Sequence, residues 1–254
     1  MTIDPALPAL AKPIEQDQPW PRPKCPTCNA GHIRFSEPDA TEAYSSTELR
    51  EHPGWDPDWI SGTFSVNGQC ENPGCQQIVH GTGDFYVSHS KEREEEYPNF
   101  AYSSFYTVSH LHPPILLMTV PQSAPEQVRD GVIRASRVLF ADPGLAATAM
   151  RATVERFLTS QGIPATDEKG TFQSAHRRIQ KWLKADSKRE RIADMLDAVK
   201  WLGNVGTHED SDLTSIEVLD GATVLDEAFH RLFTGPDIDV RAQTINAARG
   251  VSRQ

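Results

Sequence analysis

The chain has 254 residues, a formal net charge of −10 at pH 7, 38% hydrophobic residues and 24% charged residues. This length predicts one or two domains with a core that is stable without disulfides, and the composition excludes a fibrous or largely disordered protein. No apolar run is long enough to span a bilayer, and the N-terminal region lacks the apolar stretch of a signal peptide. We therefore expect a cytoplasmic protein that does not enter a membrane.

The charge is unevenly distributed along the chain. Residues 1–120 carry 7 Lys and Arg against 16 Asp and Glu, whereas the remaining residues carry 18 against 19. An acidic chain is not attracted nonspecifically to nucleic acid or to anionic membranes. Any contact with RNA or DNA therefore requires a local basic patch in the second half.

The first half is expected to form an arm and a small β-rich domain. Residues 1–24 are rich in proline and acidic residues, which predicts an extended arm with little to bury. Residues 25–120 contain short alternating runs that are typical of strands, at 63–66, 78–80, 84–87 and 103–108. The stretch Gly81–Asp84 between two of these runs is typical of a hairpin turn.

The pattern changes to helical spacing in the second half. Helices are predicted over 126–140, 143–161, 172–183, 189–202 and 215–233. The second follows an N-cap and a first-turn proline, Asp142-Pro143, and the last begins with a capping box at Thr214. Gly203-Asn204 is expected to end the fourth helix, since both residues adopt the left-handed cap conformation readily. We expect an all-α bundle over 121–234 and a polar tail over 235–254.

The four cysteines of the chain form two close pairs, Cys25 with Cys28 and Cys70 with Cys75. Two such pairs on separate turns bring four thiolates to one Zn²⁺ in a tetrahedron. Disulfides are disfavoured in the cytoplasm, and a redox Cys-x-x-Cys pair expects a βα context that is missing here. We therefore predict a zinc-ribbon domain over 25–120 with one structural Zn²⁺, for which His32 and His80 are substitute ligands. A closed site of this kind folds its domain and does no chemistry.

Three stretches of the second half carry a resemblance to a known family. They are PPI at 113–115 followed by Val120-Pro121, ATAMRATVE at 147–155, and LGNVGTH at 202–208. In this order they resemble domain-of-unknown-function family 4145, a prokaryotic family of the HEPN-like superfamily that often carries an N-terminal zinc ribbon. The resemblance covers residues 110–233. It implies a compact helical bundle that is often dimeric, and a role in prokaryotic defence against foreign nucleic acid.

The resemblance also implies a candidate catalytic site. Many HEPN domains are metal-independent ribonucleases that use an arginine, four to six further residues and then a histidine, which here is His208. Its candidate partners are Lys200, Asn204, Arg151 and Glu155. The motif arginine is missing, because positions 201–203 hold Trp, Leu and Gly and the nearest cation is Lys200. This departure favours an interaction or regulatory module over an enzyme.

The same residues also have a structural interpretation. Arg151 and Glu155 are four apart, so they share a helix face next to small residues that permit close helix contact. They form either an ordinary surface ion pair or a partly buried network that reaches Asn204 and His208. Within such a network, His208 is either a structural member or a catalytic acid or base.

A basic cluster lies at residues 176–191, with seven Lys and Arg side chains. It is the local patch suited to phosphate contact, and its candidate nucleic-acid-binding residues are Arg177, Arg178, Lys181, Lys184 and Lys188. A solvated helix face is the more common explanation for such a run.

The sequence therefore predicts an α+β protein, in which a small β-rich zinc ribbon is followed by an all-α HEPN-like bundle. Three functions remain open: an interaction or regulatory module, a ribonuclease, and an accessory protein that binds nucleic acid. We expect self-association through helical faces near 143–161 or 189–208, with a protein, RNA or DNA as a further partner.

Overall fold

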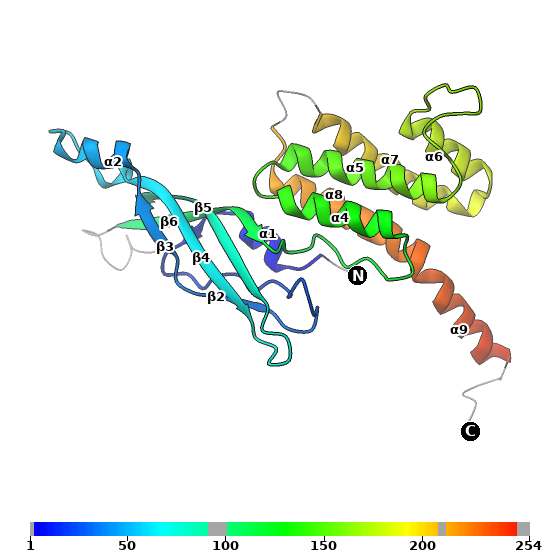
Figure 1. Cartoon of the computed structure of the whole chain (residues 1–254), viewed down its shortest axis with the longest axis horizontal. Coiled ribbons are helices and arrows are strands. Elements are labelled where there is room, and N and C mark those ends of the chain that lie inside the picture. The colour runs from blue at the N-terminus through cyan, green and yellow to red at the C-terminus, as the bar shows by residue number, and fades with distance from the viewer. Residues whose placement is uncertain (1–2, 91–100, 208–211, 248–254) are drawn as a thin grey trace. The chain divides into compact units, whose positions relative to one another are not determined.

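The computed structural model describes residues 3–90, 101–207 and 212–247, and the chain divides into two compact units (Figure 1). The first unit consists mainly of residues 4–115 and is rich in β-structure; the second consists mainly of residues 116–254 and is helical. This confirms the α+β class. No helix in the described ranges combines the length and apolarity needed to cross a bilayer.

The first unit is built on a six-stranded antiparallel sheet. Its strands are β1 (Ile14–Glu15), β2 (Ile33–Phe35), β3 (Asp39–Glu42), β4 (Ser61–Cys70), β5 (Ile78–His89) and β6 (Tyr102–His112). They are paired in the order β1-β6-β5-β4-β2, and β3 also pairs with β4. The long strands β4, β5 and β6 curl together (Figure 1). This sheet is larger than the small ribbon that the sequence predicts.

One face of the sheet forms the core of the first unit. Alternate residues of β4 and β5 are buried, among them Phe64, Val66, Val79 and Phe85, because successive side chains of a strand point to opposite faces. Helix α2 (Tyr44–Glu48) and the 3-10 turns η1 (Leu49–Glu51) and η2 (Pro57–Trp59) lie between β3 and β4 in the chain. The cysteines therefore lie at the opposite end of β4 from these short helices.

The hairpin turn predicted at Gly81–Asp84 is wrong. These residues lie inside β5, paired with β4 on one side and with β6 on the other, and a register shift occurs between Thr82 and Gly83. A Cβ atom on Gly83 would lie 2.0 Å from the carbonyl oxygen of Thr107. The glycine is there because the strands approach closely at this bulge, and not because the chain turns.

The N-terminal segment is not the extended arm that its prolines predict. Helix α1 (Ala6–Leu10) buries Leu7 and Leu10, and β1 pairs with β6. The Trp20 ring lies 5.4 Å from that of Phe35 and 5.9 Å from that of Phe64. Apolar residues spaced between the prolines thus make residues 4–24 part of the first unit.

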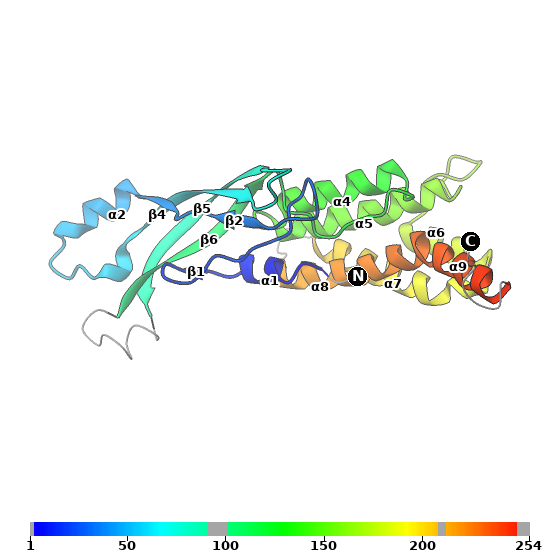
Figure 2. The same cartoon turned by 90° about the horizontal axis from the view of Figure 1, so that it is seen from below.

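The second unit is a helical bundle, in which α4 and α5 lie in one layer and α7 and α8 in the other (Figure 2). Its helices are α4 (Glu126–Val138), α5 (Pro143–Ser160), α6 (Ala175–Lys184), α7 (Glu190–Val205), α8 (Ser215–Phe233) and α9 (Gly235–Ala247), with the 3-10 turn η3 (Ser187–Arg189) before α7. Phe157 of α5 contacts the rings of Trp182, Phe229 and Phe233, so three helices share one aromatic core. The capping box of Thr214 with Glu217 is present as predicted.

Several helix boundaries differ from the prediction: the helix predicted over 126–140 ends at Val138, and the one predicted over 172–183 begins at Ala175. Gly203-Asn204 does not end α7, which continues to Val205; a Cβ atom on Gly203 would lie 2.4 Å from the Cβ of Arg151, so this glycine allows α5 and α7 to touch. The region expected to be a polar tail forms α9. Since proline is tolerated in the first turn of a helix, Gly235-Pro236 begins a new helix where α8 ends.

Candidate metal centre and polar clusters

The two cysteine pairs lie on turns that are built in the same way. Cys25 and Cys28 precede β2, whereas Cys70 is the last residue of β4 and Cys75 lies in the turn that follows. The residue after each second cysteine has a positive φ of 52°. In each turn a backbone N–H also donates to a carbonyl three or four residues earlier, which closes the bend. Each turn is therefore closed by its own backbone hydrogen bonds, within the few residues that each cysteine pair spans.

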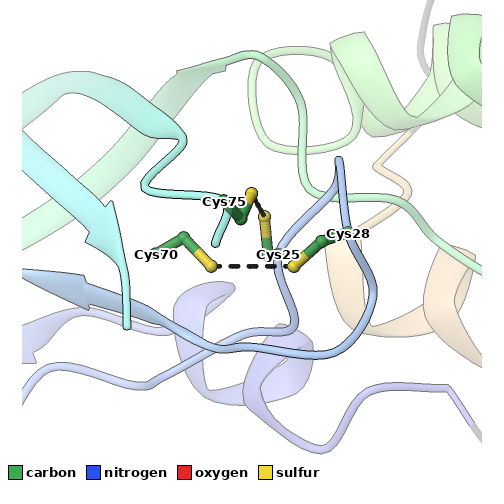
Figure 3. A group of neighbouring side chains, drawn as sticks. All are labelled: Cys25, Cys28, Cys70 and Cys75. Carbon is green, nitrogen blue, oxygen red and sulfur yellow. Dashed lines mark hydrogen bonds between the residues drawn. The ribbon is translucent and has the colours of Figure 1, made fainter. Parts of the chain in front are cut away.

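The four sulfur atoms converge on one point (Figure 3). All four cysteines are free, and their sulfur atoms lie within 4.8 Å of one another. The Sγ–Sγ distances are 3.8 Å for Cys25 with Cys75 and 3.7 Å for Cys28 with Cys70. A tetrahedron with Zn–S bonds of about 2.3 Å has edges of about 3.8 Å. The distances therefore fit a metal site with four thiolate ligands, two from each turn.

The surroundings of the sulfur atoms shift the pKa values of the thiols in opposite directions. The backbone N–H groups of Gly31 and Ala30 lower the pKa of the Cys28 thiol to about 6, whereas burial raises the pKa of Cys70 to about 12. Cys25 and Cys70 are both buried. Four thiolates this close repel one another, so a divalent cation is needed to hold them all ionised together.

The histidines considered as substitute ligands lie outside this group. Among the described residues, the cluster that is able to hold a metal consists of the four cysteines. His32 and His80 are both exposed, and the Nδ1 atom of His80 lies 2.7 Å from the Oδ1 atom of Asn67. A site closed by four sulfurs has no coordination position for water or substrate, which is typical of structural zinc.

Three of the residues proposed for the polar network meet in the helical unit. Arg151 donates through Nε to the Oε1 atom of Glu155 at 3.2 Å and through Nη1 to the Oδ1 atom of Asn204 at 2.8 Å. Arg151 and Glu155 are about 30% exposed, which makes this a partly buried network rather than a surface ion pair. His208, the fourth proposed member, lies outside the described residues.

Arg178 is buried, although the sequence places it among the candidate nucleic-acid-binding residues. Its side chain is 1% exposed, and its guanidinium donates to the carbonyl oxygens of Glu155 and Ile163 at 2.7–3.1 Å and to the Oγ1 atom of Thr159 at 2.7 Å. These acceptors belong to the C-terminal end of α5 and the segment that follows it. Arg178 therefore ties the C-terminal part of α5 to the segment that follows it and cannot reach an external phosphate.

The other four candidate nucleic-acid-binding residues lie on the surface. Arg177, Lys181, Lys184 and Lys188 are exposed, and Lys181 donates to the side chain of Gln173. They remain accessible to a phosphate backbone. The group is thus one residue smaller than the sequence predicts.

Lys200, the cation nearest to the missing arginine position, is also buried. Its Nζ lies 3.0 Å from the Oδ1 atom of Asp197 and 3.4 Å from the centre of the Trp201 ring, and its side chain is 5% exposed. Asp197 in turn contacts Nδ1 of His176 at 3.0 Å. Asp197 was not among the predicted site residues, although its spacing of three from Lys200 places the two on one helix face.

Two family models match the chain. Residues 133–248 match a domain of unknown function, DUF4145, and residues 14–110 match another domain of unknown function, DUF8608. The first match confirms the resemblance of the helical half, although it begins within α4 and extends through α9. The second begins at the first residue of β1. No curated protein and no solved structure matches the chain.

Proposed function

We propose that this chain is an interaction module in which one structural Zn²⁺ folds the β-rich unit and the helical unit, of HEPN-like type, associates with a second copy. The role in prokaryotic defence implied by the resemblance is part of this proposal. The fit of the four sulfur atoms to a zinc tetrahedron supports the metal. The observation that carries the interaction role is a group of exposed apolar side chains on α5 and α7.

This group, the α5–α7 patch, consists of Leu145, Trp201 and Val205, which are 49%, 61% and 48% exposed. Trp201 and Val205 are one turn apart on α7. The next residue, Gly206, is so close to α5 that a Cβ atom on it would lie 2.3 Å from the carbonyl oxygen of Gly144. The start of α5 and the end of α7 therefore lie side by side, and each carries exposed apolar residues of the patch. Exposed tryptophan is enriched at the centres of protein interfaces.

Self-association through this patch predicts a dimer in solution. Light scattering at tens of micromolar protein is expected to give about twice the chain mass of 28.2 kDa. Trp201→Glu is expected to weaken the dimer by about 30-fold or more, because loss of a central interface tryptophan costs about 2 kcal/mol or more. Phe172→Glu is the matched control, since Phe172 is 65% exposed but lies outside the patch. A wild-type mass near that of one chain contradicts the proposal.

A metal-independent ribonuclease is the main alternative function. It requires an accessible cation beside His208, but Lys200 is held by Asp197 and Trp201, and Arg151 is held by Glu155 and Asn204. These contacts support a structural role for both cations and favour the interaction module.

The four exposed cations of α6 and η3 support a second alternative, an accessory protein that binds nucleic acid. One assay with labelled single-stranded RNA separates the three functions. We expect the wild-type protein to leave the RNA intact, because its candidate catalytic cations are engaged. Cleavage that His208→Ala abolishes would establish the ribonuclease. Binding without cleavage that weakens in the Lys181→Glu, Lys184→Glu double variant, with a shallower salt dependence, would establish the accessory protein.

A further inference from the structure

Asn72 connects the two cysteine turns through its side-chain amide. It lies in the second turn, between Cys70 and Cys75, and its Oδ1 atom accepts the backbone N–H of Gly74 at 3.0 Å. Its Nδ2 atom donates to the Sγ atom of Cys28 in the first turn at 3.7 Å. Because the oxygen is needed as the acceptor for Gly74, the amide nitrogen is the atom that faces the sulfur.

The space around Asn72 keeps this amide in place. The first turn approaches so closely that a Cβ atom on Gly31 would lie 2.8 Å from the Cβ of Asn72 and 2.7 Å from the Sγ atom of Cys70. The backbone N–H of Gly31 also donates to the Cys28 sulfur, at 3.4 Å. Cys28 therefore receives N–H donors both from its own turn and, through Asn72, from the opposite turn.

Resting on the metal site proposed above, we propose that Asn72 is a positioning residue that stabilises the metal-bound thiolate of Cys28 across the two turns and thereby slows release of the metal. Four thiolates around a divalent cation carry a net charge of −2, and N–H donors to sulfur reduce the repulsion among them. Partners that hydrogen-bond to metal ligands are worth about 10–100-fold in metal affinity. Asn72 also ties the first turn to the second, so a thiolate that leaves the metal is held near it.

The substitution Asn72→Asp removes the N–H donor to the Cys28 sulfur and keeps the side-chain length. Aspartate keeps an oxygen for the N–H of Gly74 but places a second oxygen against the Cys28 sulfur. The matched control is Gln77→Glu, which adds the same charge. The Gln77 side chain also links the turns, because its Oε1 atom accepts from Thr27 Oγ1 at 2.8 Å, and its Nε2 atom donates to the carbonyl oxygen of Ile78 rather than to a sulfur.

The experiment follows transfer of zinc from the full chain to a chromogenic chelator, together with the sulfur-to-cobalt absorption of the Co²⁺-substituted protein. We expect Asn72→Asp to weaken zinc affinity by about 10–100-fold and to shift the cobalt band, while Gln77→Glu stays near wild type. The variant Asn72→Ser removes the amide donor without adding charge. We expect it also to weaken zinc affinity, and it replaces the aspartate variant if that variant fails to fold.

Two results overturn the inference, and they are distinguishable. Wild-type rates and spectra in both Asn72 variants would remove the role of Asn72 while leaving the zinc site intact. Equal losses in Asn72→Asp and Gln77→Glu, with none in Asn72→Ser, would show that added charge alone is responsible. Wild-type protein without stoichiometric zinc contradicts the proposed metal site itself, and the role of Asn72 with it.

Discussion

Replacing Cys70 by serine is expected to abolish metal binding and to unfold the β-rich unit. Cys70 is 3% exposed and ends β4, so its sulfur links this strand to Cys28 in the turn before β2. Structural zinc contributes about 10–16 kcal/mol in small zinc-binding peptides, which equals or exceeds the total stability of a typical domain, about 5–15 kcal/mol. The helical unit has its own core and is expected to remain folded.

Metal analysis by mass spectrometry and limited proteolysis of the full chain check this result. The wild-type protein should contain one zinc per chain and resist cleavage in both units. The Cys70→Ser variant should lose the zinc and become susceptible within residues 4–90. His80→Ala is the control, because this exposed imidazole lies outside the sulfur group. A Cys70→Ser variant that resists protease like the wild type would show that the unit does not depend on a metal.

Replacing Arg178 by alanine is expected to lower the free energy of unfolding of the helical unit by about 1.5–3 kcal/mol, the range for hydrogen bonds made by a charged group. The substitution empties a buried site and leaves the carbonyl oxygens of Glu155 and Ile163 without their charged donor. Arg177→Ala is the matched control: it removes the same side chain from the adjacent, exposed position, and its effect should stay within about 0.5 kcal/mol. Denaturant unfolding measures both, and equal effects would contradict the buried role.

The candidate metal site was predictable from the sequence because the two cysteines of each pair lie within a few residues of each other. Each turn is fixed by a few residues between its two cysteines, and two such turns are sufficient to define four ligands. The sheet around them was only partly predictable, since β1 and β6 pair across most of the unit and no local pattern encodes that contact. Gly81 and Gly83 were misread because a glycine required by close strand approach is indistinguishable in sequence from one that makes a turn.

The structural role of Arg178 is predictable from the spacing of the buried residues along its helix, independently of its charge. The buried residues of α6 are Ala175, Arg178, Ile179 and Trp182, which follow the spacing of three and four that marks an interior face. Arg177, Lys181 and Lys184 lie off this stripe. The charge pattern alone predicts a solvated or phosphate-binding run, so the periodicity is the better guide to which cation is structural.

The pairing of β1 with β6 sets the order in which the β-rich unit can form during synthesis. Ile14 pairs with Tyr106, so the sheet cannot close until more than a hundred residues have left the ribosome. The four cysteines are complete much earlier, at residue 75. The proposed Zn²⁺ site is therefore complete before the first strand has a partner. An ion bound at this site would shorten the loop that β1 must close, which would reduce the entropic cost of the contact between β1 and β6.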